Sequence, residues 1–247
     1  MSRRVALLLG GVLIAATGRL ATDPVEHETP SAGPVTPEVA THFTLGGALP
    51  APSAAPTGRA SADGEATTGS RPKVVSRGDG RLHVMPGQSK RFGTGPLKRF
   101  SVSVEGRLGV DARAFTKAVE TTLGNSRSWI NGGRMSVQRV DSGPVDFRVV
   151  LASPVLTDRM CAPLDTEGEY SCANGSTAVL NSMRWVNGAD SYSRHLIAYR
   201  HYLVNHEVGH ALGRGHADCP GPGLPAPVMM QQTVGVGACL PSAWPYP

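Results

Sequence analysis

Three histidines and one glutamate stand within a short stretch of this chain, HEVGHALGRGH, from His206 to His216. His206 and His210 are four residues apart, so a helix presents both imidazoles on one face, one turn apart. Two imidazoles at this spacing can hold one metal ion, and the Glu207 carboxylate beside them can act as general base towards a water that the metal activates. The pattern is typical of zinc hydrolases.

The residues after His210 supply a turn and a third histidine. Gly213 follows His210 by three residues, and His216 follows Gly213 by three. A continuing helix would carry the next histidine past the metal, whereas a glycine with positive φ ends the helix and turns the chain back. We therefore expect His206, His210 and His216 to bind Zn²⁺ and to leave a fourth position open, as catalytic sites do. Asp218 is either a residue that orients a ligand or an ordinary loop aspartate.

The stretch HEVGHALGRGH resembles the metzincin zinc metallopeptidases, and its HExGHxLGxxH form is similar to the matrix metalloprotease branch. The resemblance implies a zincin-like domain with a methionine turn beneath the histidines. We place Met229, in the segment PAPVMMQQT, in that turn, with Met230 as the alternative; the other interpretation is that both fill the core. Gln231 stands where some metzincins carry a tyrosine, and no cysteine for a cysteine switch precedes residue 95.

A second resemblance covers about two-thirds of the chain, from about residue 80 to the end. This part is similar to an uncharacterised family of secreted or anchored actinobacterial proteins with zinc-protease motifs. The stretches that carry the similarity are GTGPLKRFSVSVEG, CAPLDT, YSCANG, NHEVGHALGRGH, CPGPG and PAPVMMQQT. It supports a protease interpretation and implies no particular substrate.

These features predict a zinc endopeptidase that cleaves a polypeptide. Glu207 would take the proton of the attacking water and pass it to the leaving amine. By resemblance to metzincins, the strand at 177–181 could pair with an extended substrate; a plain core or edge strand is the alternative. Two other functions stay open: a zinc hydrolase of a non-protein envelope substrate, and a noncatalytic zinc-stabilised binding domain. The intact Glu207 argues against the last, because a structural site needs no base.

The elements that position this motif follow from hydrophobic periodicity. A helix from 112 to 123, capped by Asp111, and a long helix from 191 to 212 have apolar residues at helical spacing. Gly209 inside the long helix costs ~1 kcal/mol against alanine, which indicates close approach of another segment. The expected strands are 81–85, 97–106, 134–140, 145–153 and 177–181. This order predicts an α+β domain over residues 80–247, with a mixed sheet, a long active-site helix and a loop-rich C-terminal part.

The N-terminal third differs in character. Arg3 and Arg4 precede an apolar run from 5 to 16, the layout of a secretory signal over residues 1–21. A short membrane anchor is the alternative, so the chain is exported and either free or held at the membrane. Residues 22–79 are rich in Pro, Ala, Ser, Thr and Gly and predict a disordered linker.

Cysteines and charge limit the remaining classes of function. The four cysteines of an exported chain predict disulfides; three pairings are possible, and we favour Cys161–Cys172 and Cys219–Cys239, which close short loops. Zinc ligation by these thiolates is disfavoured, since no CxxC pair occurs. Residues 96–247 hold fourteen Lys/Arg against twelve Asp/Glu, so the domain is nearly neutral and we expect no nucleic-acid partner. We expect a monomer.

Overall fold

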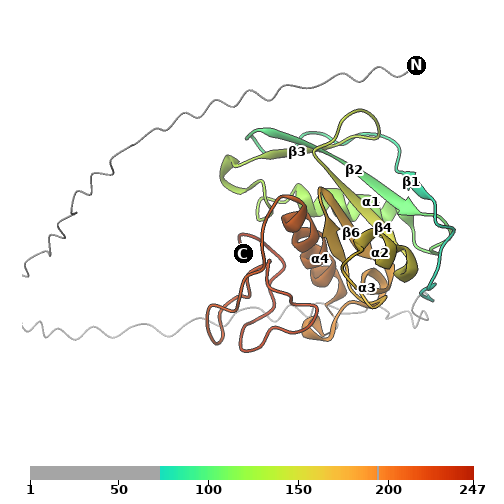
Figure 1. Cartoon of the computed structure of the whole chain (residues 1–247). Helices are drawn as coiled ribbons and strands as arrows, with labels where there is room; N and C mark the ends of the chain where they lie inside the picture. Colours follow the sequence, from blue (N-terminus) through green and yellow to red (C-terminus); the bar gives the residue numbers. More distant parts are fainter. Residues whose placement is uncertain (1–72, 194) are drawn as a thin grey trace, which may run out of the picture. The chain divides into compact units, whose positions relative to one another are not determined.

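The computed structural model describes residues 73–193 and 195–247 (Figure 1). The predicted signal or anchor at 1–21, and the linker as far as residue 72, lie outside the described residues. Two 3₁₀ turns, Asn131–Gly133 and Asp190–Tyr192, accompany the helices and strands. In chain order these are β1 (Leu82–Val84), β2 (Leu97–Glu105), α1 (Ala112–Leu123), β3 (Ser136–Arg139), β4 (Phe147–Ala152), α2 (Pro154–Cys161), β5 (Cys172–Asn174), β6 (Thr177–Asn181), α3 (Ser182–Asn187) and α4 (Leu196–Ala211).

The strands form one mixed, open sheet in the order β1-β2-β4-β6-β5, and β3 pairs with β2 outside that path. Strands β2, β4 and β6 are parallel, and β3 is parallel to β2. Strands β1 and β5 run antiparallel to their neighbours and form the two ends of the path. The mixed α+β architecture expected from the order of elements is therefore confirmed.

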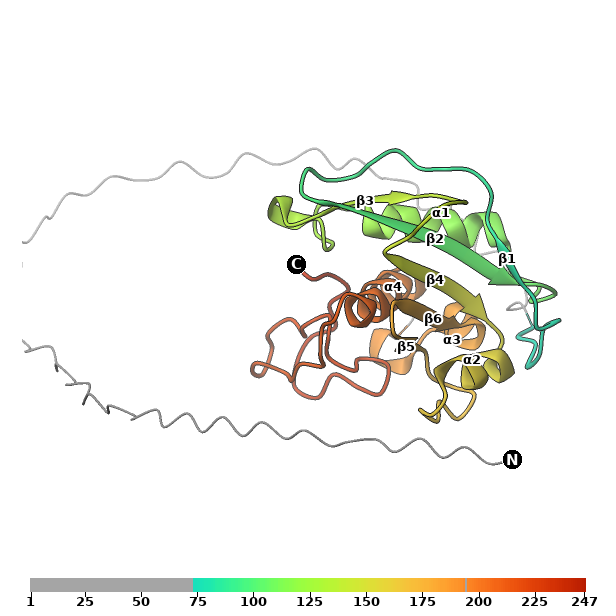
Figure 2. The same cartoon turned by 45° about the horizontal axis from the view of Figure 1, so that its top comes forward.

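The period of two along the strands divides the apolar residues between the faces of the sheet. Val149 and Leu151 of β4 face the main core, in which residues of α1 and α4 also lie. Val150 and Ala152 belong to a smaller cluster on the other side, together with both cysteines of the Cys161–Cys172 disulfide. The loop-rich C-terminal part lies beside α4 in both views (Figures 1 and 2).

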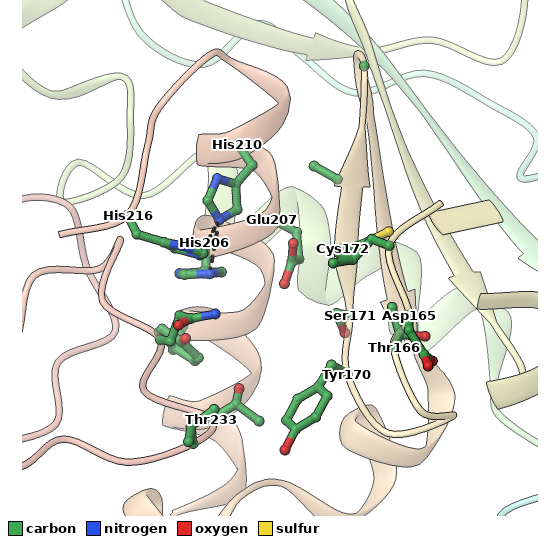
Figure 3. Close-up of a pocket in the computed structure, with 16 residues that line it drawn as sticks. Asp165, Thr166, Tyr170, Ser171, Cys172, His206, Glu207, His210, His216 and Thr233 are labelled. Atoms are coloured by element: carbon green, nitrogen blue, oxygen red, sulfur yellow. Dashed lines mark hydrogen bonds between the residues drawn. The ribbon is translucent and has the colours of Figure 1, made fainter. Parts of the chain in front are cut away.

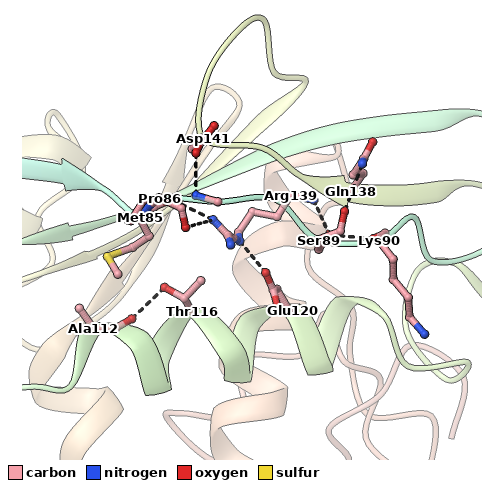
Figure 4. Close-up of polar contacts among 11 residues, drawn as sticks. Met85, Pro86, Ser89, Lys90, Ala112, Thr116, Glu120, Gln138, Arg139 and Asp141 are labelled. Atoms are coloured by element: carbon pink, nitrogen blue, oxygen red, sulfur yellow. Dashed lines mark hydrogen bonds and ion pairs between the residues drawn. The ribbon is translucent and has the colours of Figure 1, made fainter.

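Helix α1 begins as the sequence predicted. The Asp111 side chain accepts hydrogen bonds from the N–H groups of Arg113 and Ala114, which caps the helix. A buried guanidinium then ties this helix to the sheet (Figure 4): Arg139 of β3 donates to the Glu120 carboxylate of α1 and to the carbonyl of Met85. A buried charge needs both a counter-charge and hydrogen-bond acceptors, and Arg139 has them.

Three details of the secondary structure differ from the predictions. The long helix begins at Leu196, not at residue 191, because the 3₁₀ turn and Ser193, with φ 51°, interrupt the chain. Strand β6 is not free to pair with a substrate: it is hydrogen-bonded to β4 on one side and to β5 on the other. The short edge strand β5 and the helices α2 and α3 were not predicted.

Residues 73–79, which composition placed in the linker, belong to the folded unit. The Asp79 N–H donates to Gly106 O, and Ser76 O accepts from the Val155 N–H. Val75 packs against the main core. In the part of the chain that the structure describes, no helix is both long and apolar enough to span a membrane.

Both favoured disulfides are confirmed. Cys161–Cys172 joins the end of α2 to the start of β5, with the two Cα atoms 6.1 Å apart, and Cys219–Cys239 joins two loops of the C-terminal part, with a separation of 5.8 Å. Every cysteine is paired. Because structural disulfides persist in oxidising compartments, the pairs indicate an extracytoplasmic environment.

Candidate metal centre

Helix α4 and the turn after it bring the three histidines together. The helix ends in a Schellman turn: Gly213, with φ 82°, donates to His210 O, and the Arg214 N–H donates to Gly209 O. This is the positive φ that the sequence required at Gly213. The chain then doubles back and carries His216 to the histidines of the helix, so that one nitrogen from each of the three rings lies within 4.8 Å of the others.

The Nε2 atoms of the three rings point towards one another (Figure 3). His210 Nε2 lies 3.2 Å from His206 Nε2 and 3.0 Å from His216 Nε2. His206 Nδ1 donates to Val228 O, and His210 Nδ1 donates to Arg214 O, each at 2.8 Å. The proton of a neutral imidazole is thereby placed on Nδ1, so both Nε2 atoms present lone pairs to each other and cannot hydrogen-bond. A shared cation satisfies such a pair.

For His206 and His216, a lowered pKa favours the neutral form that binds metals. The His206 ring is buried, and burial lowers its pKa to about 4. The pKa of His216 is also lowered, by burial and by the neighbouring His210. Neutral imidazoles at neutral pH are the required state, because a protonated ring has no lone pair to offer. Asp218 is exposed and supports neither helical ligand; the carbonyls of Val228 and Arg214 fill that role.

Glu207 is a buried carboxyl group without a full set of partners. Its side chain is 4% exposed, and its Oε2 atom has no hydrogen-bond partner among the described residues. Burial raises its pKa to about 8. The carboxyl group lies beside the histidines and faces the opposite wall of a cavity (Figure 3). A buried polar atom left unsatisfied is expensive, and functional sites are where such atoms are retained.

A methionine packs beneath the histidine-bearing helix. Met229 is 7% exposed, and its sulfur contacts the backbone of Gly209, between the two histidines of α4. Any Cβ at Gly209 would collide with Met229 and with Trp129, which explains the glycine inside the helix. Met230 is partly exposed and instead contributes its carbonyl to a hydrogen bond from Tyr202. The position predicted beneath the histidines is therefore held by Met229.

A cavity of about 470 Å³ adjoins the histidines and Glu207. One wall is α4 with the segment after Met229, and the other is β5 with the loop at 162–171 (Figure 3). Inside the disulfide-closed loop, Gly168 N–H donates to Asp158 and Gly168 O accepts from the Asn181 side chain. Ser171 Oγ accepts from the Asn181 N–H. A fixed wall thus stands opposite the histidines, although β5 itself has only three residues.

Two tyrosines of this cavity were not predicted from the sequence. Tyr202 lies one turn before His206 on α4; its hydroxyl donates to Met230 O and accepts from the Gln232 N–H, which ties the helix to the methionine segment. Its position four residues from His206 was the available signal. Tyr170 lines the opposite wall (Figure 3), and no local pattern marks it. Gln231 also lines the cavity.

Comparison with known proteins identifies a family without a known function. Residues 68–239 match the family model described as "Protein of unknown function (DUF3152)". The match includes all three histidines, Glu207 and the four cysteines. No curated protein and no solved structure matches the chain significantly.

Proposed function

We propose that this chain, which belongs to the DUF3152 family of proteins of unknown function, is a zinc-dependent metallopeptidase. The observation that carries the proposal is the convergence of three Nε2 atoms beside a buried, unpaired carboxyl group at one end of a cavity. A helix with two histidine ligands, a base next to the first, and a third histidine after a glycine turn is the arrangement of the metzincin-like zinc hydrolases that the sequence resembles.

The donor set fits Zn²⁺. Nitrogen ligands lie about 2.0–2.1 Å from a zinc ion, so two of them at tetrahedral angles are about 3.3 Å apart. The observed separations of 3.2 Å and 3.0 Å are close to that value. Backbone carbonyls hold two of the rings by Nδ1, the outer support typical of histidine ligands. Bound there, the ion would supply Lewis-acid polarisation of a carbonyl and acidification of water.

Glu207 is positioned for proton transfer. Its buried carboxyl group faces the cavity, has an oxygen without a partner, and has a pKa raised to about 8. A base with a pKa near the working pH both accepts a proton from water and returns it to a leaving amine. Because Glu207 makes no structural hydrogen bond through Oε2, a purely structural explanation for burying this carboxyl group is weak.

The wall of the cavity includes an edge strand to which an extended peptide can bind. Strand β5 is at the edge of the sheet, contributes Cys172 and Ala173 to the cavity wall, and has one side unpaired among the described residues. An edge strand can add a peptide by main-chain hydrogen bonds, a role that the interior strand β6 cannot fill. Gln231 lines the cavity where some metzincins place a tyrosine, so no tyrosine-assisted step is assigned.

Metal analysis of the purified full-length chain tests the proposal. We expect one zinc per chain in the wild type, and loss of that zinc in His206→Ala, His210→Ala and His216→Ala. His201→Ala is the matched control, because His201 is on the same helix but bonds Thr122 through Nδ1. Absence of stoichiometric zinc from the wild type, or its retention in all three variants, would contradict the proposal.

A further inference from the structure

A second cavity lies behind the segment that supports the histidines. It has a volume of about 290 Å³ and shares no lining residue with the cavity at Glu207. Its floor includes Trp129 and Met229, which are buried in the main core. Val228 and Arg214 also line it, and their carbonyls accept the Nδ1 protons of His206 and His210. The second cavity and the metal centre are therefore separated by one layer of backbone.

Two arginines contribute positive charge to this cavity. The Arg214 guanidinium lies 5.8 Å from the centre of the Trp129 ring, and that of Arg134 lies 5.7 Å from the centre of the Tyr246 ring. No acidic residue lines the cavity. Within the described residues, neither guanidinium forms an ion pair, whereas Arg139 and Arg184 both do. The two charges are thus left available to a ligand.

The residues that line the cavity favour a ligand with both a carboxylate and an apolar body. A guanidinium presents a planar fork of N–H donors that matches a carboxylate in two parallel hydrogen bonds. The indole of Trp129 and the thioether of Met229 offer an apolar floor, which gains from contact with a ring or other apolar body. A small inorganic anion would use the arginines and leave that floor exposed. A neutral aromatic molecule would cover the floor and leave the arginines without an acceptor.

We infer that this cavity, between Arg134, Arg214 and Trp129, is a binding site for small carboxylates attached to an apolar ring, separate from the metal centre. The inference does not depend on the peptidase proposal, because no histidine and no part of the Glu207 cavity lines it. The site nevertheless adjoins the candidate metal centre, since Arg214 lines the site and its carbonyl accepts a hydrogen bond from His210.

Calorimetry on the full-length chain tests the site with three probes: benzoate, benzamide and acetate. Benzoate combines the carboxylate with the ring, benzamide replaces the charge by a neutral amide of the same shape, and acetate lacks the ring. We expect benzoate to bind at least tenfold more tightly than either of the others, because loss of a charged hydrogen-bonding group or of the apolar contact each removes about that factor. Equal affinity for benzoate and benzamide would overturn the inference.

Variants locate the binding. Arg134→Gln and the double variant Arg134→Gln/Arg214→Gln should weaken benzoate binding by tenfold or more. Both side chains are exposed, so folding, followed by circular dichroism, should be retained. Arg113→Gln, which removes an exposed arginine of α1 that does not line the cavity, is the matched control and should bind normally. Benzoate binding that survives in the double variant would place the ligand elsewhere, the metal centre included, and would refute the site.

Discussion

Replacement of Gly209 by alanine has two opposite effects on the stability of the fold, and the size of each is known. Gly209 lies inside α4, where alanine is favoured over glycine by about 1 kcal/mol through helix propensity. An added Cβ would lie 2.7 Å from Cζ2 of Trp129 and closer still to the Met229 sulfur. Real Cβ atoms do not approach other atoms so closely, so the neighbours must move. The sign of the stability change tells which effect is larger.

The destabilisation by steric overlap should exceed the stabilisation by helix propensity. Forcing a methyl group into a filled core costs about 1–3 kcal/mol. The upper half of that range applies, because Trp129 is buried and its indole N–H donates to Asn205 O, a bond that a shift would strain. After subtraction of the propensity gain, Gly209→Ala should lower the free energy of unfolding by about 1–2 kcal/mol. For a domain of this size the unfolding temperature falls by about 2–4 °C per kcal/mol.

Urea unfolding of the wild type and the variant measures this change. Gly235→Ala is the matched control, because nothing lies within 4 Å of its added Cβ, and it should stay within about 0.5 kcal/mol of the wild type. In a Met229→Ala background, the penalty of Gly209→Ala should shrink, since the nearest contact is gone. A Gly209→Ala variant about 1 kcal/mol more stable than the wild type would refute the packing of Met229 and Trp129 against this helix.

Three further changes test the roles of the Cys161–Cys172 disulfide, of Asn181 and of the buried Glu207 carboxyl group. Replacing Cys161 and Cys172 together by alanine should lower the free energy of unfolding by about 3 kcal/mol, read by urea titration, because the unfolded chain is released from a short loop; an unchanged midpoint would contradict this role. Asn181→Ala should destabilise by about 1–3 kcal/mol, because the half-buried Gly168 O loses its donor; hydrogen exchange in the 162–171 loop that does not change would contradict its anchoring. In metal-free protein, the pKa of Glu207 is about 8 in the folded state, above that of the unfolded chain. The folded state therefore holds an extra proton below pH 8, and stability falls as pH rises towards 8 and levels off above it. The free energy of unfolding should therefore drop by about 1–2 kcal/mol between pH 6.5 and 8 in the wild type and stay level in Glu207→Gln; equal slopes would contradict the burial of this carboxyl group.

The histidine motif was predictable because short-range sequence features determine the positions of its residues. Helical spacing places His206 and His210 on one face, and Gly213 alone determines where the chain can reverse, so His216 returns without information from distant residues. The strands β2 and β4 were equally predictable, because apolar and polar residues alternate over 100–104 of β2 and β4 contains the apolar run 149–152. The N-cap at Asp111 follows from the chemistry of one side chain.

The opposite wall of the cavity was not predictable from local patterns. Strand β5 has only three residues, too few for a periodicity, and it is held in place by β6 and by a disulfide. Whether β6 is an edge or an interior strand depends on that pairing, which is why the sequence left both alternatives open for residues 177–181, and the structure shows an interior strand. Tyr170 acquires its position from the loop between two cysteines, and the Asn181 side chain holds that loop from the end of β6, a tertiary arrangement without a sequence signature.

The most direct test of the central claim is a peptide-library digest read by mass spectrometry, with the zinc-loaded full-length chain and its Glu207→Gln variant side by side. Gln keeps the size of the side chain and removes the base, so both proteins should contain zinc. We expect new peptide termini with the wild type and none above background with Glu207→Gln. Equal cleavage by the two proteins would contradict the role of Glu207, and no cleavage by the zinc-loaded wild type would contradict the peptidase function itself.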